Sequence, residues 1–537
     1  MSTNPEQAVS VDGSDGGGGG VLDARRLRVI LVAVSMALMA VIASVSGLNV
    51  AQTEMAVDFE TSQSTVLWII NIYTLALAAL LLPLGAIGDR VGRKPMLIGS
   101  LLVFGVSNVV AAFAPSAGVM IGARVASGVG AATIMPITLA VITSTFPEER
   151  RGKAIGVWTG VAGGGGILGM FLSAFLVDVA DWRWLFALPI VLVVVALALT
   201  LKSVPNSHER SGHRFDTTGA LISVVSVAAL IFCLQEGPDR GWTSGLTLAS
   251  LVVGLIFGAV FVVWELRRRD ASLLDVRLFK ERGLGGGSIT LVVVFGVQSG
   301  IFVVLFPFLQ AVLDWSALLS AASLMPMAVT MMMASGLAPR LSVQAGPRAT
   351  MSAGIALTGV GLALIALLVS VENGYLSILP GIVVMGFGMG LAMVPSTEAI
   401  TLALPREKQG VASALNDVTR EFGTALGIAM LGAILSAGYS NAIDDKLDGI
   451  PEQAADPARE GIATALEASP NAGSSANDLI DIARQSYIDG WQQALWVGTA
   501  VMAVLFVYII LRGPNTPTPT TTENQDKTED PETAAAH

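Results

Sequence analysis

The sequence is poor in cysteine, histidine and charged residues, and each shortage excludes a class of protein. Cys233 is the only cysteine, so no disulfide framework can form within one chain. The three histidines belong to no H-E-x-x-H motif, and neither G-x-S-x-G nor the phosphate-binding G-x-x-x-x-G-K-[ST] occurs. These absences argue against an enzyme, a metal centre, a cofactor and an ATP-driven pump. Charged residues make up 13% of the chain, against roughly 25% in a soluble domain, which predicts an integral membrane protein.

Long apolar runs fill most of the chain. About 20 apolar residues suffice to cross a hydrocarbon core of about 30 Å, and the sequence contains fourteen runs of this kind. The predicted spans are 29–50, 66–87, 95–114, 118–144, 153–177, 184–203, 217–236, 246–266, 285–312, 317–338, 349–370, 375–402, 409–436 and 489–511. We therefore expect an all-α polytopic protein embedded in a lipid bilayer.

The distribution of Lys and Arg gives these spans a direction. Cytoplasmic loops of membrane proteins are enriched in both residues, and most of the 31 Lys and Arg fall in loops that a cytoplasmic N-terminus would place inside the cell. An even number of spans then puts both termini in the cytoplasm of a cell with a bacterial-type plasma membrane. The net charge of -10 comes from the two tails and from segment 437–488, so nucleic-acid binding gets no support.

A short basic segment joins the second and third spans. It reads Gly85-Ala-Ile-Gly-Asp89-Arg90-Val-Gly92-Arg93-Lys94-Pro95. Its glycines allow two helix ends to approach, and Asp89 can accept hydrogen bonds from helix N-termini. The segment follows the pattern G-x-L-a-D-R-x-G-R-K-x-x-L of the major facilitator superfamily, which the chain resembles over roughly residues 28–511. The resemblance implies a transporter whose conformational gating involves Gly85, Asp89, Arg90, Gly92, Arg93 and Lys94.

The chain also repeats itself. Residues 130–152 align with residues 388–410, which pairs spans 1–6 with spans 9–14. The resemblance implies a major facilitator fold, in which two pseudo-symmetric six-helix bundles are joined by the two inserted helices, spans 7 and 8. The predicted divisions are a disordered cytoplasmic tail 1–27, an N-terminal bundle 28–203, inserted helices with linkers 204–284, a C-terminal bundle 285–511 with an outer loop 437–488, and a disordered cytoplasmic tail 512–537. In the outer loop, Leu479, Ile482, Ala483 and Tyr487 recur at helical spacing and predict an amphipathic helix that leads into the last span.

Arg124 lies inside the fourth predicted span. An arginine at bilayer depth costs at least about 2.5 kcal/mol, so we expect a carboxylate, backbone carbonyls or water around it. The segment from Arg124 to Ala132 resembles the family pattern R-x-x-Q-G-x-G-A-A, with Ser127 in place of Gln, and this implies a role in proton coupling. A fixed structural charge, bonded to neighbouring helices, is the alternative.

Three ionisable residues lie close together in the thirteenth span. Asp417 and Glu421 share one helical face, and Arg420 is one turn from Asp417. Apolar surroundings favour the protonated form of a carboxyl group, whereas an adjacent arginine favours the ionised form. A proton carrier needs a balance between these two effects, so that the carboxyl group can both bind and release a proton. The pattern therefore predicts proton coupling, with a permanent salt bridge as the alternative. Arg420 matches the N-x-x-R-Q-x-G pattern of fourteen-helix drug antiporters, whereas Glu421 departs from it.

Two further departures bear on coupling. The drug-antiporter pattern places an Asp in helix 1 where this chain has Ser44, and the expected Pro of the antiporter signature is Met170. Any proton load of helix 1 must then lie elsewhere, at Asp417, Glu421 or Glu398, or be absent. Glu398 is a candidate if it faces the central cavity, whereas near the cytoplasmic end it would be an ordinary solvated charge.

Together these features predict a secondary transporter that exports amphipathic drugs or toxic metabolites in exchange for protons by alternating access. Trp68, Tyr73 and Asn49 are candidates to line the substrate cavity, with simple packing as the alternative for the two aromatic residues. The expected partners of the monomer are a small amphipathic substrate, protons and lipid. Transport of lipids or metabolites without proton antiport is the second hypothesis, and a non-transporting scaffold or sensor is the third.

Overall fold

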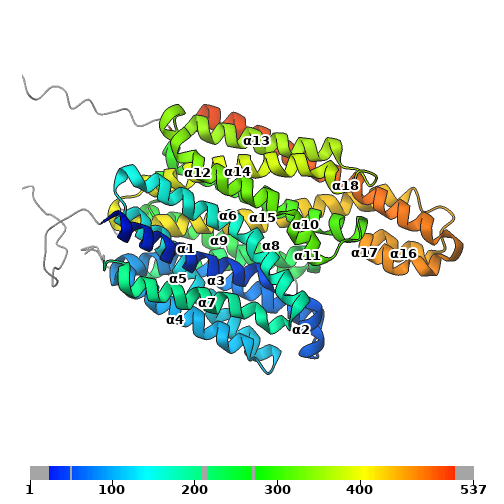
Figure 1. Cartoon of the computed structure of the whole chain (residues 1–537), viewed down its shortest axis with the longest axis horizontal. Coiled ribbons are helices and arrows are strands. Elements are labelled where there is room, and N and C mark those ends of the chain that lie inside the picture. The colour runs from blue at the N-terminus through cyan, green and yellow to red at the C-terminus, as the bar shows by residue number, and fades with distance from the viewer. Residues whose placement is uncertain (1–22, 49–50, 207–214, 269–271, 515–537) are drawn as a thin grey trace, which may run out of the picture.

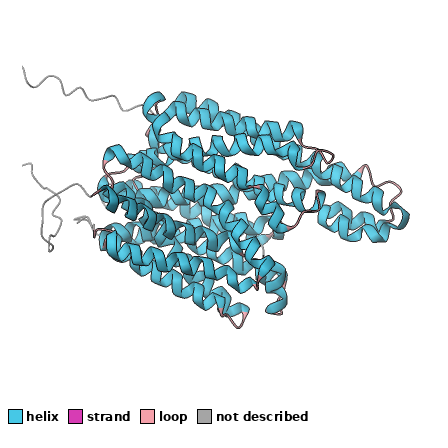
Figure 2. Cartoon of the chain, in the orientation of Figure 1, coloured by secondary structure: helices cyan, strands magenta, loops and turns pink. Residues whose placement is uncertain are grey.

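The computed structural model describes residues 23–48, 51–206, 215–268 and 272–514. This part of the chain consists of helices and short connections and contains no strand (Figure 2). Fourteen of its helical segments are long and apolar enough to cross a membrane, which confirms the predicted spans. The helices that contain them are α1 (Ala24–Gly47), α3 (Gln63–Val91), α4 (Arg93–Ala112), α5 (Ala117–Thr145), α6 (Glu148–Val179), α7 (Ala187–Ser203), α8 (Thr217–Arg240), α9 (Gly245–Arg268), α10 (Arg282–Pro307), α12 (Met325–Ala345), α13 (Pro347–Leu368), α14 (Tyr375–Ala403), α15 (Gln409–Asp444) and α18 (Ala476–Arg512). Short helices α2 (Gln52–Asp58) and α11 (Ala317–Ser323) lie between them.

Two helices extend well beyond their predicted apolar spans, and α1 begins earlier than predicted. The Asp23 side chain accepts a hydrogen bond from the Arg25 backbone N, so α1 begins at Ala24 and includes the last residues assigned to the tail. Helix α15 continues to Asp444 and α18 begins at Ala476, because polar sequence prolongs both helices outside the apolar stretch. The length of an apolar stretch therefore predicts the membrane-spanning part of a helix, but not the full length of that helix. The rest of the predicted N-terminal tail and residues 515–537 lie outside the described residues.

The two halves of the chain use the same helix contacts. In the N-terminal half α5 packs against α3 and α4, and α1 packs against α6 and α7. In the C-terminal half α14 packs against α12 and α13, and α10 packs against α15 and α18. Each half also has one glycine with a positive φ at the equivalent turn, Gly92 at 109° between α3 and α4 and Gly346 at 88° between α12 and α13. The predicted pair of pseudo-symmetric bundles is confirmed.

The halves meet along two pairs of contacts, and the inserted helices lie against one of them. Helix α15 packs against α3 and α5, and α6 packs against α12 and α14 (Figure 1). Inserted helix α8 packs against α9, α3 and α15, where Ala78, Ile231 and Ala425 form a small buried cluster. Large apolar side chains on α9 are mostly exposed, as expected of a helix that faces lipid.

A helical projection extends from one end of the C-terminal half (Figure 1). It comprises the ends of α15 and α18 with α16 (Glu452–Glu460) and α17 (Ile462–Ala468) between them. The predicted amphipathic helix is confirmed as the first part of α18, where Leu479, Ala483 and Tyr487 are buried. The Tyr439 hydroxyl donates to the Ala458 carbonyl at 2.8 Å and ties α15 to α16.

Candidate functional site

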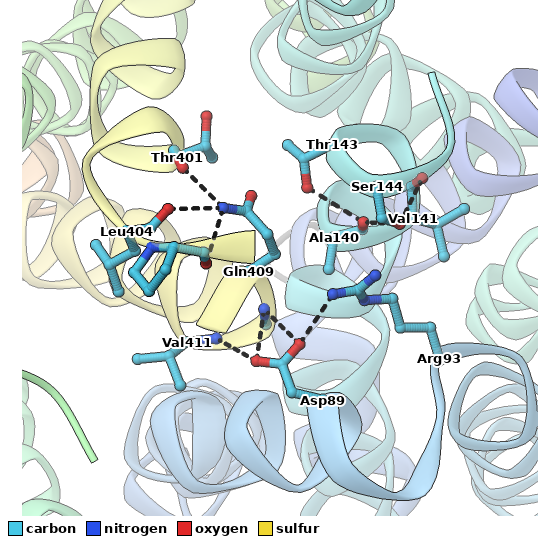
Figure 3. Close-up of polar contacts among 12 residues, drawn as sticks. Asp89, Arg93, Ala140, Val141, Thr143, Ser144, Thr401, Leu404, Gln409 and Val411 are labelled. Carbon is cyan, nitrogen blue, oxygen red and sulfur yellow. Dashed lines mark hydrogen bonds and ion pairs between the residues drawn. The ribbon is translucent and has the colours of Figure 1, made fainter. Parts of the chain in front are cut away.

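Asp89, at the end of α3, joins the two halves. Its carboxylate accepts hydrogen bonds from the backbone N of Gly410 at 2.8 Å and 2.9 Å and from that of Val411 at 3.3 Å (Figure 3). These amides belong to the first turn of α15, whose N–H groups have no partner within the helix and carry partial positive charge. The sequence predicted that Asp89 accepts hydrogen bonds from a helix N-terminus, and this is confirmed. We call this junction of Gly85, Asp89, Gly410 and Val411 the α3–α15 contact.

The α3–α15 contact depends on two facing glycines. A Cβ added to Gly85 would lie 2.6 Å from the Gly410 carbonyl oxygen, closer than real Cβ atoms approach. A Cβ added to Gly410 would in turn collide with the Gly85 carbonyl oxygen and the Asp89 carboxylate. The two helices can therefore approach this closely only because both positions lack a side chain.

The basic residues of the same loop contact the surrounding helices. Arg93 Nη2 lies 3.3 Å from Asp89 Oδ1, and both side chains are almost fully buried. Lys94 Nζ donates to the Leu201 carbonyl at the end of α7 at 3.0 Å. The Arg90 guanidinium lies over the Phe215 ring, 5.5 Å from its centroid, just before inserted helix α8. The loop thus joins the N-terminal half to both α15 and the inserted pair.

Arg124 of α5 is enclosed within the N-terminal half, with 1% of its surface exposed. Its Nη1 donates to Ser44 Oγ at 3.0 Å, its Nε donates to the Ile69 carbonyl at 3.4 Å, and its guanidinium lies 4.1 Å from the centre of the Tyr73 ring. Its Nη2 has no hydrogen-bond partner among the described residues, and no described carboxylate lies within ion-pair distance. Of the expected partners, the backbone carbonyl is present and the carboxylate is not. The neighbouring position in α1 is Ser44, the residue that replaces the Asp of the drug-antiporter pattern.

Asp417 and Arg420 form a buried ion pair in α15. Arg420 Nη1 lies 3.5 Å from Asp417 Oδ1, and Asn416 Nδ2 donates to the same oxygen at 3.1 Å. The exposed fractions of Asp417 and Arg420 are 0% and 6%. Asp417 Oδ2 and Arg420 Nε have no partner among the described residues, so the pair retains unused hydrogen-bonding capacity.

Arg420 also lies at a contact between the halves. Its guanidinium is 4.4 Å from the Phe295 ring centre on α10 and 5.5 Å from the Trp158 ring centre on α6. Trp158 belongs to the N-terminal half and is fixed there by a 3.1 Å hydrogen bond from its Nε1 to Thr138. Phe295 and Trp158 could not be predicted from the sequence, because a cation–π contact between distant helices leaves no local pattern.

The remaining candidates occupy different places. Glu421 is partly buried on the same helix, one turn after Asp417. Glu398, near the end of α14, faces the first turns of α6, since its Oε1 lies 3.2 Å from where a Cβ at Gly152 would stand. Trp68 contacts Phe232 of inserted helix α8, with ring centres 5.8 Å apart, and Tyr73 is fully buried beside Arg124. Asn49 lies outside the described residues.

The described ionisable candidates occupy three separate environments. Among the described residues, no group of three or more His, Cys, Asp or Glu is placed to hold a metal ion. The structure brings Asp417, Arg420 and Glu421 together on α15, whereas Arg124 and Glu398 lie in separate environments. Ionisable residues buried at membrane depth mark a candidate functional site, and here the ion pair lies where the two halves touch.

Comparison with known proteins agrees with this architecture. A family model described as Major Facilitator Superfamily matches residues 32–428. Multidrug resistance protein Stp of Mycobacterium tuberculosis is 29% identical over 497 residues, which cover 90% of this chain and 91% of Stp. Multidrug efflux pump LfrA of Mycolicibacterium smegmatis is 31% identical over 457 residues, which cover 84% of this chain and 88% of LfrA.

Solved structures share the fold at low sequence identity. The human organic anion transporter MFSD10 (TETRAN) superimposes with a TM-score of 0.57 and 14% identity, over 90% of this chain and 99% of that one. A bacterial homolog of the human lysosomal transporter Spinster, in an inward-facing and unoccupied conformation, has a TM-score of 0.57 and 16% identity, over 91% and 97% of the two chains. At these identities the likeness establishes the fold alone.

Proposed function

Because this chain belongs to the major facilitator superfamily, we propose that it is a secondary transporter that exports amphipathic drugs or toxic metabolites in exchange for protons. The names of its relatives, a multidrug efflux pump and a multidrug resistance protein, support the drug substrate class. One observation carries the proton coupling: Asp417 and Arg420 form a buried ion pair where the two halves touch. The transporter acts as a monomer in the plasma membrane, with both termini in the cytoplasm.

The proposed cycle is alternating access between the two halves. The α3–α15 contact closes one side, and its release opens that side. A proton on Asp417 removes the negative charge next to Arg420, so the ion pair is lost and the contact between Arg420 and Trp158 can change. Since Arg420 and Trp158 belong to different halves, protonation alters how the halves fit together. Exchange requires that the bound proton weaken substrate binding, which makes the two events reciprocal.

Transport without proton antiport is the second candidate, and the surroundings of Arg124 favour it. Arg124 contacts Ser44 where the antiporter pattern places an Asp, and no described carboxylate pairs with it. If coupling in this family depends on that helix-1 carboxylate, this chain moves its substrate without exchanging protons. The two candidates differ in whether a pH gradient drives flux.

Proteoliposomes with an imposed pH gradient distinguish the candidates. The assay follows efflux of a fluorescent amphipathic dye for the wild type, for Asp417→Asn and for the control Glu236→Gln. Glu236 is a suitable control because it is also buried and paired with an arginine, Arg240, yet it lies on inserted helix α8.

The exporter proposal predicts that the gradient accelerates wild-type efflux and that Asp417→Asn loses this acceleration by about 5- to 150-fold, the range of typical coupling free energies. Glu236→Gln retains it. A wild-type efflux rate that is the same with and without the pH gradient would instead support the second candidate, transport without proton antiport. Dye retention by every variant, in liposomes that contain correctly folded protein, would reject both.

A further inference from the structure

Two carboxylates are buried together outside the site described above. Asp216 caps inserted helix α8, and Glu265 lies in the last turn of inserted helix α9. Their exposed fractions are 2% and 1%. The point where a Cβ at Gly219 would stand is 2.7 Å from Asp216 Oδ2 and 2.6 Å from Glu265 Oε1, so the two oxygens face the same small space.

The two carboxylates differ in their partners. Asp216 accepts hydrogen bonds from the Gly219 backbone N at 2.9 Å and from Trp264 Nε1 at 3.0 Å, and it pairs with Arg268 at 2.8 Å. Glu265 Oε2 accepts from the Leu274 backbone N at 3.3 Å, whereas its Oε1 has no partner among the described residues. A buried acceptor without a donor is costly, by about 1–3 kcal/mol, unless something supplies the missing proton.

A proton on Glu265 would relieve the repulsion between the two carboxylates. Two carboxylates that occupy one site repel each other when both are ionised, so such pairs hold a proton between them. A proton on Glu265 Oε1 would remove one of the two facing charges and neutralise the oxygen that has no donor. The other charged groups that act on the pair are Arg268, which is bonded to Asp216, and Lys408, which precedes α15.

The carboxylate pair is connected to both sides of the α3–α15 contact. Phe215, next to Asp216, lies under the Arg90 guanidinium, and Arg90 follows Asp89 on α3. Ser272, two residues before Leu274, accepts a hydrogen bond through its carbonyl from Lys408 Nζ at 2.8 Å, and Lys408 directly precedes α15. The inserted pair therefore contacts the N-terminal half and the C-terminal half at the place where they close.

We propose that Glu265 holds a proton in the space that it shares with Asp216 and that this proton site clamps the inserted helices across the α3–α15 contact. With the proton bound, Glu265 keeps the Leu274 segment in place, and the contacts of Phe215 and Ser272 hold both halves. Loss of the proton at higher cytoplasmic pH leaves two facing negative charges, which loosens the clamp and favours opening. The role in gating rests on the proposed transport function, whereas the proton site itself does not.

Distances between the halves test the clamp without any substrate. Spin labels are placed at Glu149→Cys and Val343→Cys in a Cys233→Ala background, in the full chain reconstituted in nanodiscs. Glu149 lies in the first turn of α6 and Val343 in the last turn of α12, both are exposed, and the two helices pack across the halves. Electron–electron double resonance then gives the ratio of short to long distances between about pH 6 and about pH 8.

We expect the wild-type ratio to fall about fivefold or more as the pH rises, a coupling of about 1 kcal/mol. Glu265→Gln keeps the shape of the side chain and carries no charge, so its ratio at about pH 8 stays well above that of the wild type. Any pH dependence that remains comes from Asp417 and is lost in the double variant Glu265→Gln/Asp417→Asn. Lys408→Met breaks the link to the C-terminal half and gives a low ratio throughout. The buried control Glu236→Gln behaves like the wild type.

The proposal is overturned if the wild-type ratio does not change with pH, if Glu265→Gln responds as the wild type does, or if Glu236→Gln abolishes the response. The dye-efflux assay separates this result from the proposed function. Proton-driven efflux together with a ratio that Glu265→Gln leaves as in the wild type rejects the clamp alone. A ratio that depends on Glu265 in a protein without efflux rejects the exporter alone.

Discussion

Replacing Gly410 with alanine tests whether the α3–α15 contact controls closure. In the structure the added Cβ would lie 2.8 Å from Asp89 Oδ1 and would also collide with the Gly85 carbonyl oxygen. The oxygen of Gly85 belongs to the backbone and cannot rotate away. The closed arrangement must then spread, and Asp89 loses its short hydrogen bonds to the first turn of α15.

The size of the effect follows from these contacts. Overpacking of a tight contact costs about 1–3 kcal/mol, and this cost applies to the closed state alone. The gain in helix propensity from glycine to alanine, up to about 1 kcal/mol, cancels because α15 is a helix in both states. The ratio of closed to open protein should therefore fall by about 5- to 150-fold.

The spin labels at positions 149 and 343 measure this ratio directly. Gly432→Ala is the matched control, because it adds the same methyl group to the same helix at ordinary contact distance, 3.9 Å from Val303 Cγ1. The control should leave the distance distribution unchanged. An unchanged distribution in Gly410→Ala as well would refute the view that this glycine pair holds the halves closed.

Three further substitutions test separate contacts by thermal unfolding in detergent. Ser44→Asp places a carboxylate beside Arg124, whose Nη2 lacks a partner, and should stabilise the fold by about 1–3 kcal/mol; a lower melting temperature would contradict this. Gly427→Ala places a Cβ against the Gly296 backbone of α10 and should destabilise the fold by about 1–3 kcal/mol. Its control is Gly99→Ala, whose added Cβ meets open space and should leave the melting temperature unchanged. Tyr487→Phe removes the 2.5 Å hydrogen bond to the Val304 carbonyl and should cost about 1–2 kcal/mol; equal melting temperatures would show that this bond contributes nothing.

The sequence predicted the membrane helices well because each span must satisfy a simple physical requirement. A segment that crosses the bilayer needs about 20 apolar residues, and this requirement is local. The polar ends of α15 and α18 obey no such requirement, so their full lengths were not predicted. The helical spacing of Leu479, Ala483 and Tyr487 nevertheless predicted the outer part of α18, because burial of one face repeats with the helical period.

Partners across the molecule were harder to predict than the residues themselves. Asp89 was predicted to accept hydrogen bonds from a helix N-terminus, but the identity of Gly410 and Val411 depends on residues more than three hundred positions away. Trp68 was a candidate for the cavity, yet its ring contacts Phe232 of an inserted helix. An aromatic residue in an apolar helix has the same local sequence whether it faces substrate or another helix.

Helix α15 is long enough to couple movements at its two ends. Its 36 residues extend about 54 Å, from the α3–α15 contact at one end to the outer projection at the other. A tilt of about 10° around its middle would move each end by about 5 Å in opposite directions. An antibody fragment raised against α16 and α17 would therefore report, or arrest, a movement whose origin lies on the far side of the bilayer.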